Sequence, residues 1–259
     1  MAATQPQLHG FPDLEALAST LRTAILDAQN ESISLRGNFK IAVSAGAVPD
    51  SLAAALLPKP GRSNDVFKFD KWEVFLADER AVPLDHADSN YNLLKTTLLD
   101  KLPVDQRPRV YPIEAKYLDN LPELASQYEQ TLNGVFGTAV PRVLPEFDLL
   151  ILGCGPDGHL CSLFPGHPLL EEREAFVAPI DDSPKPPPRR VTLTLPVVTN
   201  ARGIIFVVLG PEKRVTLRSI LDEPGNLTGA LVNRSAGGRV RWFADEAALE
   251  GVRCPRANA

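Results

Sequence analysis

The sequence has few of the features that mark membrane, secreted or nucleic-acid-binding proteins. No apolar run in its 259 residues is long enough to cross a membrane. Its 27 Lys and Arg against 32 Asp and Glu give a net charge of −5, without the basic face that nucleic acids require. Three cysteines are too few for a disulfide framework, which predicts reduced thiols. The start, MAATQPQLHGFPDL, lacks the pattern of a signal peptide, so the expected location is the cytoplasm.

The sequence does contain enough apolar residues, 44%, for a sizeable core, and they follow an alternating pattern. Helix-like periodicity covers residues 14–30, 49–57, 90–99, 121–132 and 211–221, with a last helical turn at 245–249. Strand-like runs lie between these segments, at residues 39–43, 72–77, 109–113, 147–152, 191–195, 203–209 and 240–243. This alternation predicts one α/β domain, residues 1–259, with a mostly parallel sheet covered by helices on both faces.

Prolines are abundant and cluster at one place. Pro184, Pro186, Pro187 and Pro188 predict a stiff, extended surface loop just before a strand. The strands on either side look like parts of one sheet, so we interpret the cluster as a loop rather than a domain linker.

Ligands of open parallel sheets bind beyond the carboxyl ends of the strands, which selects four segments here. Residues 44–47 are small, so their N–H groups could approach an anion, although an ordinary tight turn explains them equally well. Asp78, Glu79 and Arg80 end a strand, and one or two of them are expected to face the crevice unless the strand end is simply solvated. Lys213 stands in the first turn of a helix, where a cation is unfavourable unless it meets an anion.

The fourth segment, residues 153–159, carries three glycines and a histidine at the mouth of the predicted sheet. Glycines leave backbone N–H groups unshielded. His159 can act as a general base near neutral pH, because the ordinary pKa of histidine is about 6.5. Asp157 either orients His159 or hydrogen-bonds the backbone of its own loop.

Two other interpretations of this segment are weaker. It matches the dinucleotide fingerprint G-x-G-x-x-G, with Asp181 at a plausible distance, but Pro165, Gly166 and Pro168 interrupt the helix that the fingerprint needs. A metal site can also be drawn from four side chains whose spacing fits no zinc pattern: Cys154, His159, Cys161 and His167. We therefore expect neither a metal nor a cofactor.

Taken together, the motifs resemble the 6-phosphogluconolactonase family over residues 12–250. The resemblance rests on SAGAVP at 44–49, FLADERAVPLDHADSNY at 75–91, FDLLILGCGPDGHLCSLFPGH at 147–167, RRVTLTLPVVTNAR at 189–202, GPEKR at 210–214 and GGRVRWFADEAAL at 237–249. It implies a Rossmann-like three-layer sandwich of the NagB/RpiA-like kind, related to glucosamine-6-phosphate deaminases.

The resemblance also implies an activity, hydrolysis of 6-phospho-D-glucono-1,5-lactone to 6-phospho-D-gluconate, the second step of the oxidative pentose phosphate pathway. His159 would activate water with Asp157 beside it, and Arg80 would face the substrate. The developing oxyanion would meet loop N–H groups around Gly155 to Gly158 or Arg80, a choice that the sequence leaves open. The other implied substrate-binding residues, most of them around the phosphate, are Ser44, Gly46, Asp78, Arg190 and Lys213. The partner is then a small sugar-phosphate lactone, with no nucleic acid or membrane, and the chain is a monomer or weak homodimer.

Some features depart from the family or point to another function. Ala45 replaces the first of two glycines that commonly follow the serine, and its methyl group could narrow the phosphate loop. The proline-rich segment looks longer or stiffer than usual and could alter access to Arg190. An isomerising deaminase would have a glutamate where this chain has Phe164, and a binding protein without catalysis would not need His159 and Arg80. Lactone hydrolysis is the hypothesis that these residues favour.

Overall fold

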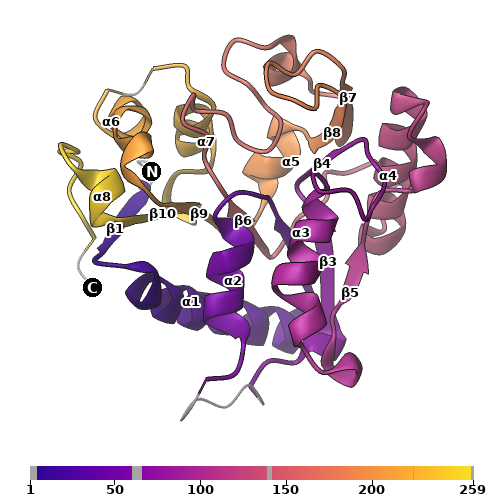
Figure 1. Ribbon diagram of the computed structural model, residues 1–259, viewed down its shortest axis with the longest axis horizontal. Helices are drawn as coiled ribbons and strands as arrows, with labels where there is room; N and C mark the ends of the chain where they lie inside the picture. Colours follow the sequence, from indigo (N-terminus) through magenta and orange to yellow (C-terminus); the bar gives the residue numbers. More distant parts are fainter. Residues whose placement is uncertain (1–4, 60–65, 139–141, 224, 258–259) are drawn as a thin grey trace.

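The computed structural model describes residues 5–59, 66–138, 142–223 and 225–257, and its centre is a parallel sheet (Figure 1). Seven strands lie in the order β1-β10-β9-β6-β2-β3-β5, and every neighbouring pair is parallel. Their bounds in that order are Gln7–Phe11, Val240–Asp245, Ile204–Val208, Leu149–Leu152, Phe39–Val43, Trp72–Leu76 and Arg109–Tyr111. The predicted α/β architecture with a mostly parallel sheet is confirmed.

The strands are apolar on both faces because each face has its own core. In β6, Leu149 and Ile151 belong to one hydrophobic cluster, while Leu150 and Leu152 belong to the other. All four side chains are at most 1% exposed. The unbroken apolar run that predicted this strand thus reflects burial between two helical layers.

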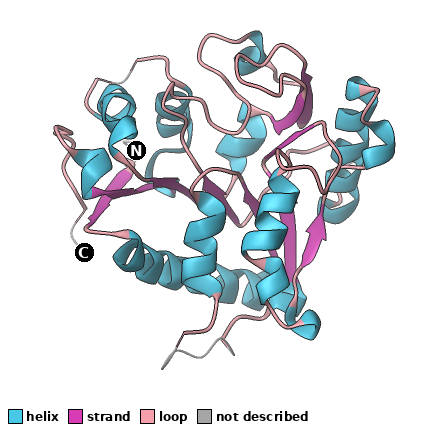
Figure 2. Ribbon diagram, viewed as in Figure 1, coloured by secondary structure: helices cyan, strands magenta, loops and turns pink. Residues whose placement is uncertain are grey.

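Helices cover both faces of the sheet (Figure 2). One cluster takes side chains from α1, α2 and α3, with bounds Leu14–Arg36, Val48–Leu56 and Asn90–Thr97. The other takes side chains from α4 to α8, with bounds Leu121–Phe136, Leu195–Asn200, Arg214–Leu221, Thr228–Ala236 and Glu246–Leu249. Short 3-10 helices lie at Phe69–Lys71, Leu99–Lys101, Val104–Gln106, Ala115–Tyr117, Pro168–Glu171, Pro211–Lys213 and Gly237–Arg239. No helix within the described ranges is both long and apolar enough to span a membrane.

A second sheet is antiparallel and stands beside the carboxyl ends of the main strands. It has the order β4-β8-β7, with bounds Asp78–Arg80, Arg190–Leu193 and Val177–Ile180. Ala77 joins the two sheets, because its N–H donates to Val43 at 2.8 Å and its carbonyl accepts from Leu193 at 2.8 Å. The expectation that residues 191–195 form a strand of the main sheet was therefore wrong: this strand ends at Leu193 and belongs to the small sheet.

The proline-rich segment also differs from its prediction. It links β7 to β8 as a series of bends rather than as an extended stretch. The bends bring the carbonyl oxygens of Lys185, Pro186 and Pro187 onto the guanidinium group of Arg190. The loop is thus folded around a charged side chain.

Candidate active site

A cavity of about 350 Å³ opens where the carboxyl ends of β2, β6 and β9 meet the small sheet. Eight of the ten predicted site residues line it: Ser44, Gly46, Asp78, Arg80, Gly155, His159, Arg190 and Lys213. Asp157 and Gly158 do not line the cavity, but they belong to the loop that carries His159. The strand-end rule therefore selected the edge of the sheet at which this cavity opens.

One wall of the cavity is made by residues 44–47, between β2 and α2. Ser44 Oγ accepts the N–H of Gly153 at 2.8 Å, which joins this turn to the histidine loop. Helix α2 begins after Ala47 without a side-chain cap, so its first N–H groups are available to an anion.

The glycine that this turn needs is Gly46. Its φ of +74° lies in the left-handed region, whereas Ala45 is not among the residues with positive φ. An alanine at position 45 therefore causes no backbone strain, although its methyl group stands at the cavity surface.

Lys213 completes this wall from the 3-10 turn Pro211–Lys213, just before α6. Its side chain is 17% exposed, and its Nζ lies 3.8 Å from Glu212 Oε1. Such a distance leaves the ammonium free to meet a second anion in the cavity.

The small sheet makes the opposite wall through the alternation of side chains along β4. Asp78 and Arg80 line the cavity, while Glu79 points to the other side. Oε1 and Oε2 of Glu79 accept the N–H groups of Arg80, Asn90 and Tyr91 and the hydroxyl of Ser89. Burial raises the pKa of Glu79, although these hydrogen bonds act against the shift. Asp78 and Arg80 therefore line the cavity, whereas Glu79 binds the N–H groups at the start of α3.

Arg80 has one nitrogen without a partner. Its Nη1 donates to the carbonyl of Asp88 at 2.7 Å, which fixes the side chain. Its Nε is buried and has no hydrogen-bond partner among the described residues. A buried unpaired N–H is costly, so this donor is suited to an oxygen atom of a bound ligand.

Arg190 on β8 is paired with Arg80 on the neighbouring strand β4 and is 2% exposed. Nε and Nη2 donate to the carbonyls of Pro187, Lys185 and Pro186 at 2.9, 2.8 and 3.2 Å, respectively. Nη1 lies 3.4 Å from Ser162 Oγ, and that hydroxyl donates to Asp78 at 2.8 Å. Most donors of Arg190 therefore bind protein groups, and within the described part of the chain only Nη1 retains an N–H without a partner.

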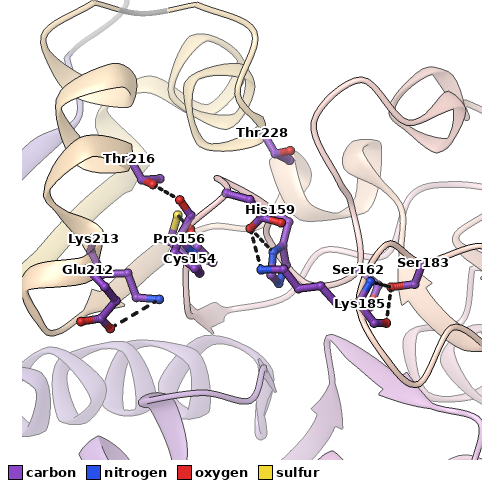
Figure 3. Close-up of polar contacts among 12 residues, drawn as sticks. Cys154, Pro156, His159, Ser162, Ser183, Lys185, Glu212, Lys213, Thr216 and Thr228 are labelled. Atoms are coloured by element: carbon purple, nitrogen blue, oxygen red, sulfur yellow. Dashed lines mark hydrogen bonds and ion pairs between the residues drawn. The ribbon is translucent and has the colours of Figure 1, made fainter.

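The histidine loop lies between the two walls and is fixed by hydroxyl groups from three elements. Thr216 of α6 donates to the carbonyl of Pro156, and Thr228 of α7 donates to that of Leu163 at 3.0 Å. The N–H of Ser162 donates to Thr192 Oγ1 of β8 at 3.2 Å. Figure 3 draws His159 with Lys213 on one side and Ser162 on the other.

Gly155 is required by the approach of His159. A Cβ atom at position 155 would lie 2.2 Å from Cε1 and Nδ1 of the imidazole ring. The N–H groups of Gly155 and Gly158 are already used within the loop, on the carbonyls of His159 and Gly155, both at 2.9 Å. These two N–H groups are therefore poor candidates for oxyanion donors.

His159 is oriented from one side by Asp157. Its Nδ1 lies 2.5 Å from Asp157 Oδ1, and its ring packs on Phe164 with centroids 4.7 Å apart. Burial lowers the pKa of His159, and the bond to Asp157 offsets part of this effect. Partial burial acts to raise the pKa of Asp157, but its contacts with His159 and Lys185 outweigh it and lower that pKa to about 2. These shifts favour a neutral imidazole beside an ionised carboxylate.

The two cysteines of the site are poor nucleophiles. Burial raises the pKa of Cys154 to about 12 and raises that of Cys161 as well, so both remain thiols. Within the described ranges, no three His, Cys, Asp or Glu side chains are grouped to hold a metal ion.

A second hollow, of about 460 Å³, lies at the opposite edge of the sheet. It contains Arg36 and Asp148, which form an ion pair at 2.7 Å, and Asp148 also accepts the N–H of Lys40. The described residues that line this hollow include neither a glycine-rich loop nor a histidine. The cavity around His159 is therefore the candidate active site.

Sequence reasoning missed two residues of this region. Ser162 links Asp78 to Arg190, and Lys185 from the proline-rich loop lies 3.0 Å from Asp157 Oδ1. For Lys185 the sequence did offer one signal: it is the single lysine in the run of prolines that leads to Arg190.

Comparison with known proteins agrees with this geometry. The family profile described as glucosamine-6-phosphate isomerases/6-phosphogluconolactonase matches residues 12–242. The chain is 43% identical over 267 residues to the 6-phosphogluconolactonase of Homo sapiens, covering 98% of this chain and 97% of the relative. It is 42% identical over 246 residues to a probable 6-phosphogluconolactonase of Schizosaccharomyces pombe, covering 93% and 94%. The crystal structure of 6-phosphogluconolactonase from Leishmania guyanensis superposes with a TM-score of 0.80 at 26% identity, covering 95% of this chain and 98% of that one.

Proposed function

The chain belongs to the glucosamine-6-phosphate isomerase and 6-phosphogluconolactonase family, and we propose that it hydrolyses 6-phosphogluconolactone to 6-phosphogluconate. The observation that carries the proposal is the presence in one cavity of a half-buried histidine, oriented by Asp157, and an unpaired arginine donor. This reaction would place the enzyme in the oxidative pentose phosphate pathway.

His159 supplies the base. Because Nδ1 faces Asp157, the proton of the attacking water goes to Nε2. The water oxygen bonds to the lactone carbonyl carbon, whose π electrons move onto the carbonyl oxygen. When that electron pair returns, the bond between this carbon and the ring oxygen breaks. The proton on Nε2 passes to the leaving oxygen, and the resulting acid then ionises in water.

Arg80 is the group best suited to the oxyanion. Its Nε is an unpaired donor held in place by the Nη1 contact with Asp88. A donor that is fixed before reaction stabilises developing charge without reorganisation. The loop N–H groups of Gly155 and Gly158 are engaged elsewhere, which favours Arg80 between the two alternatives.

The phosphate is assigned to the other wall. Lys213 brings a cation, and the turn at Ser44 and Gly46 leads into the uncapped start of α2. Cations and helix N-termini are the usual partners of phosphate. Asp78 is left for hydroxyl groups of the sugar. The resemblance places Arg190 at the phosphate as well, and that role stays a prediction, because most of its donors bind protein groups.

An assay of ring opening tests this function. We expect the purified protein to accelerate opening of 6-phosphogluconolactone above its spontaneous rate and to leave glucosamine 6-phosphate unchanged. His159→Asn should lower kcat/KM by about 10²–10⁴-fold, because the base is lost. His167→Asn is the matched control, since His167 contacts Asp182 outside the cavity.

The pH profile of kcat/KM gives a second reading. His159 acts as a base only when unprotonated, and burial lowers its pKa below the ordinary value of 6.5. The rate should therefore rise with pH through a midpoint below 6.5 and be level above it. Full activity in His159→Asn, or deamination of glucosamine 6-phosphate, would overturn the proposal.

A further inference from the structure

The proline-rich loop places a lysine against the site without lining the cavity. Lys185 lies between Pro184 and Pro186, and its carbonyl accepts from Ser183 Oγ at 2.9 Å and from Arg190 Nη2 at 2.8 Å. Prolines restrict the backbone around it. The backbone of Lys185 is thus fixed by hydrogen bonds from two buried residues, Ser183 and Arg190.

The ammonium group of Lys185 meets the carboxylate that orients the histidine. Its Nζ lies 3.0 Å from Asp157 Oδ1, the same oxygen that lies 2.5 Å from His159 Nδ1. Figure 3 shows the side chain of Lys185 extending from its loop toward His159. One carboxylate oxygen therefore joins a cation and the imidazole ring.

We propose that Lys185 is a positioning residue for the hydrolysis proposed above, with Arg190 and the proline-rich loop as its support. The lysine keeps Asp157 ionised and directed at Nδ1, and it favours the neutral form of His159. This inference rests on the proposed function, although its central claim concerns the protonation of one histidine.

The charges around His159 show why the lysine matters. Asp157 from the same loop and Asp78 from β4 both favour the imidazolium form, while Lys185 opposes it. Without Lys185 the two carboxylates would lose the one cation that contacts Asp157 in the described residues, while Arg80, Arg190 and Lys213 would still line the cavity. Burial would then account for more of the preference of His159 for its unprotonated form.

An ion pair that is this exposed contributes little to the free energy of unfolding. The Lys185 and Asp157 side chains are 36% and 37% exposed, and pairs of this kind are worth little to stability. The effect of the pair should therefore appear in the titration of His159 rather than in Tm.

The test compares Lys185→Met and Lys185→Arg with Lys95→Met in the full-length protein. Lys95 is a matched control, because its Nζ lies 2.6 Å from Asp100 Oδ2 and neither residue lines the cavity. The sequence has only four histidines, so the imidazole signals can be followed by NMR and the His159 signal assigned from His159→Asn.

In Lys185→Met we expect the pKa of His159 to rise by about half a pH unit, because a nearby positive charge is removed. At pH 6 kcat/KM should fall by up to about twofold, with little change at pH 8, after subtraction of spontaneous hydrolysis. Lys185→Arg should restore the original titration, and Lys95→Met should leave it unchanged.

An unchanged His159 titration in Lys185→Met would overturn the role of Lys185, whatever the activity. A loss of rate that is equal at every pH, with the histidine titration unmoved, would point to a structural role and overturn it too. If the unaltered protein lacked lactonase activity, the proposed function would fail, while the titration would still decide whether Lys185 controls His159.

Discussion

The two walls of the cavity hold their charges in different ways. The wall from the main sheet offers backbone N–H groups at the start of α2 and a lysine whose nearest carboxylate oxygen is 3.8 Å away. The wall from the small sheet offers Asp78 and Arg190, 5% and 2% exposed, and Arg80, each tied to neighbouring groups. The lysine of the main-sheet wall can therefore adjust its position, whereas the side chains of the small-sheet wall are fixed by hydrogen bonds.

This difference suggests a division of work. A phosphate group keeps its charge throughout lactone hydrolysis, so a flexible cation and a helix terminus stabilise the ground state and the transition state alike. The carbonyl oxygen gains charge only as the reaction proceeds, and fixed donors favour that change. We therefore expect the main-sheet wall to act on KM and the small-sheet wall to act on kcat.

Arg80→Gln should show the largest effect. Replacing the guanidinium removes the buried Nε donor, and we expect kcat to fall by about 10²–10³-fold with KM changed much less. Steady-state kinetics of ring opening measure both. Arg189→Gln is the control, because Arg189 precedes β8 but does not line the cavity. A change confined to KM would break the division between the walls.

Gly155→Ala tests the loop between the walls. The added methyl group would meet the imidazole at 2.2 Å, so His159 must move, and kcat/KM should fall by roughly 10–10²-fold. Gly134→Ala is a matched control in α4, where a Cβ atom meets nothing within 4 Å. Thermal unfolding of both variants separates displacement of the histidine from loss of the fold. Equal kinetics in the two variants would contradict the placement of His159.

Lys213→Met should give the smallest effect and sharpen the comparison most. We expect KM to rise about tenfold with kcat nearly unchanged, because the lost contact is made equally before and during reaction. Inhibition by inorganic phosphate should weaken in parallel. A fall in kcat at constant KM would place the phosphate elsewhere.

Much of the fold follows from local patterns in the sequence. The strand at Phe39–Val43 was predicted with its observed bounds, because a buried parallel strand is a short apolar run between polar ends. The helix beginning at Leu14 was predicted from its periodicity and from Asp13, whose side chain accepts the N–H of Ala16. Strand β1, at Gln7–Phe11, was not predicted, since it is short and interrupted by Gly10.

The long-range features were not accessible in this way. Strand β8 reads like a main-sheet strand, and only its pairing with β4 and β7 shows that it belongs elsewhere. The loop contacts of Arg190 are made to carbonyl groups, which every residue carries and no sequence pattern marks. The loop of His159 was found because glycine and histidine at a strand end are informative, and Arg190 and Lys213 were assigned through the family resemblance. Lys185 lies within a run of prolines and matched neither signal.

Glu79 has a consequence for how this site can change. Its carboxylate binds the start of α3, and Arg80 beside it is tied to Asp88, so the intervening connection is anchored at both ends. The orientation of Arg80 is therefore settled when the protein folds, and no side-chain entropy needs to be lost when substrate arrives. Insertions or deletions between residues 81 and 88 would shift that arginine directly. The segment lies at the surface, but its length sets the position of Arg80. Engineered loops should therefore be inserted elsewhere in this protein.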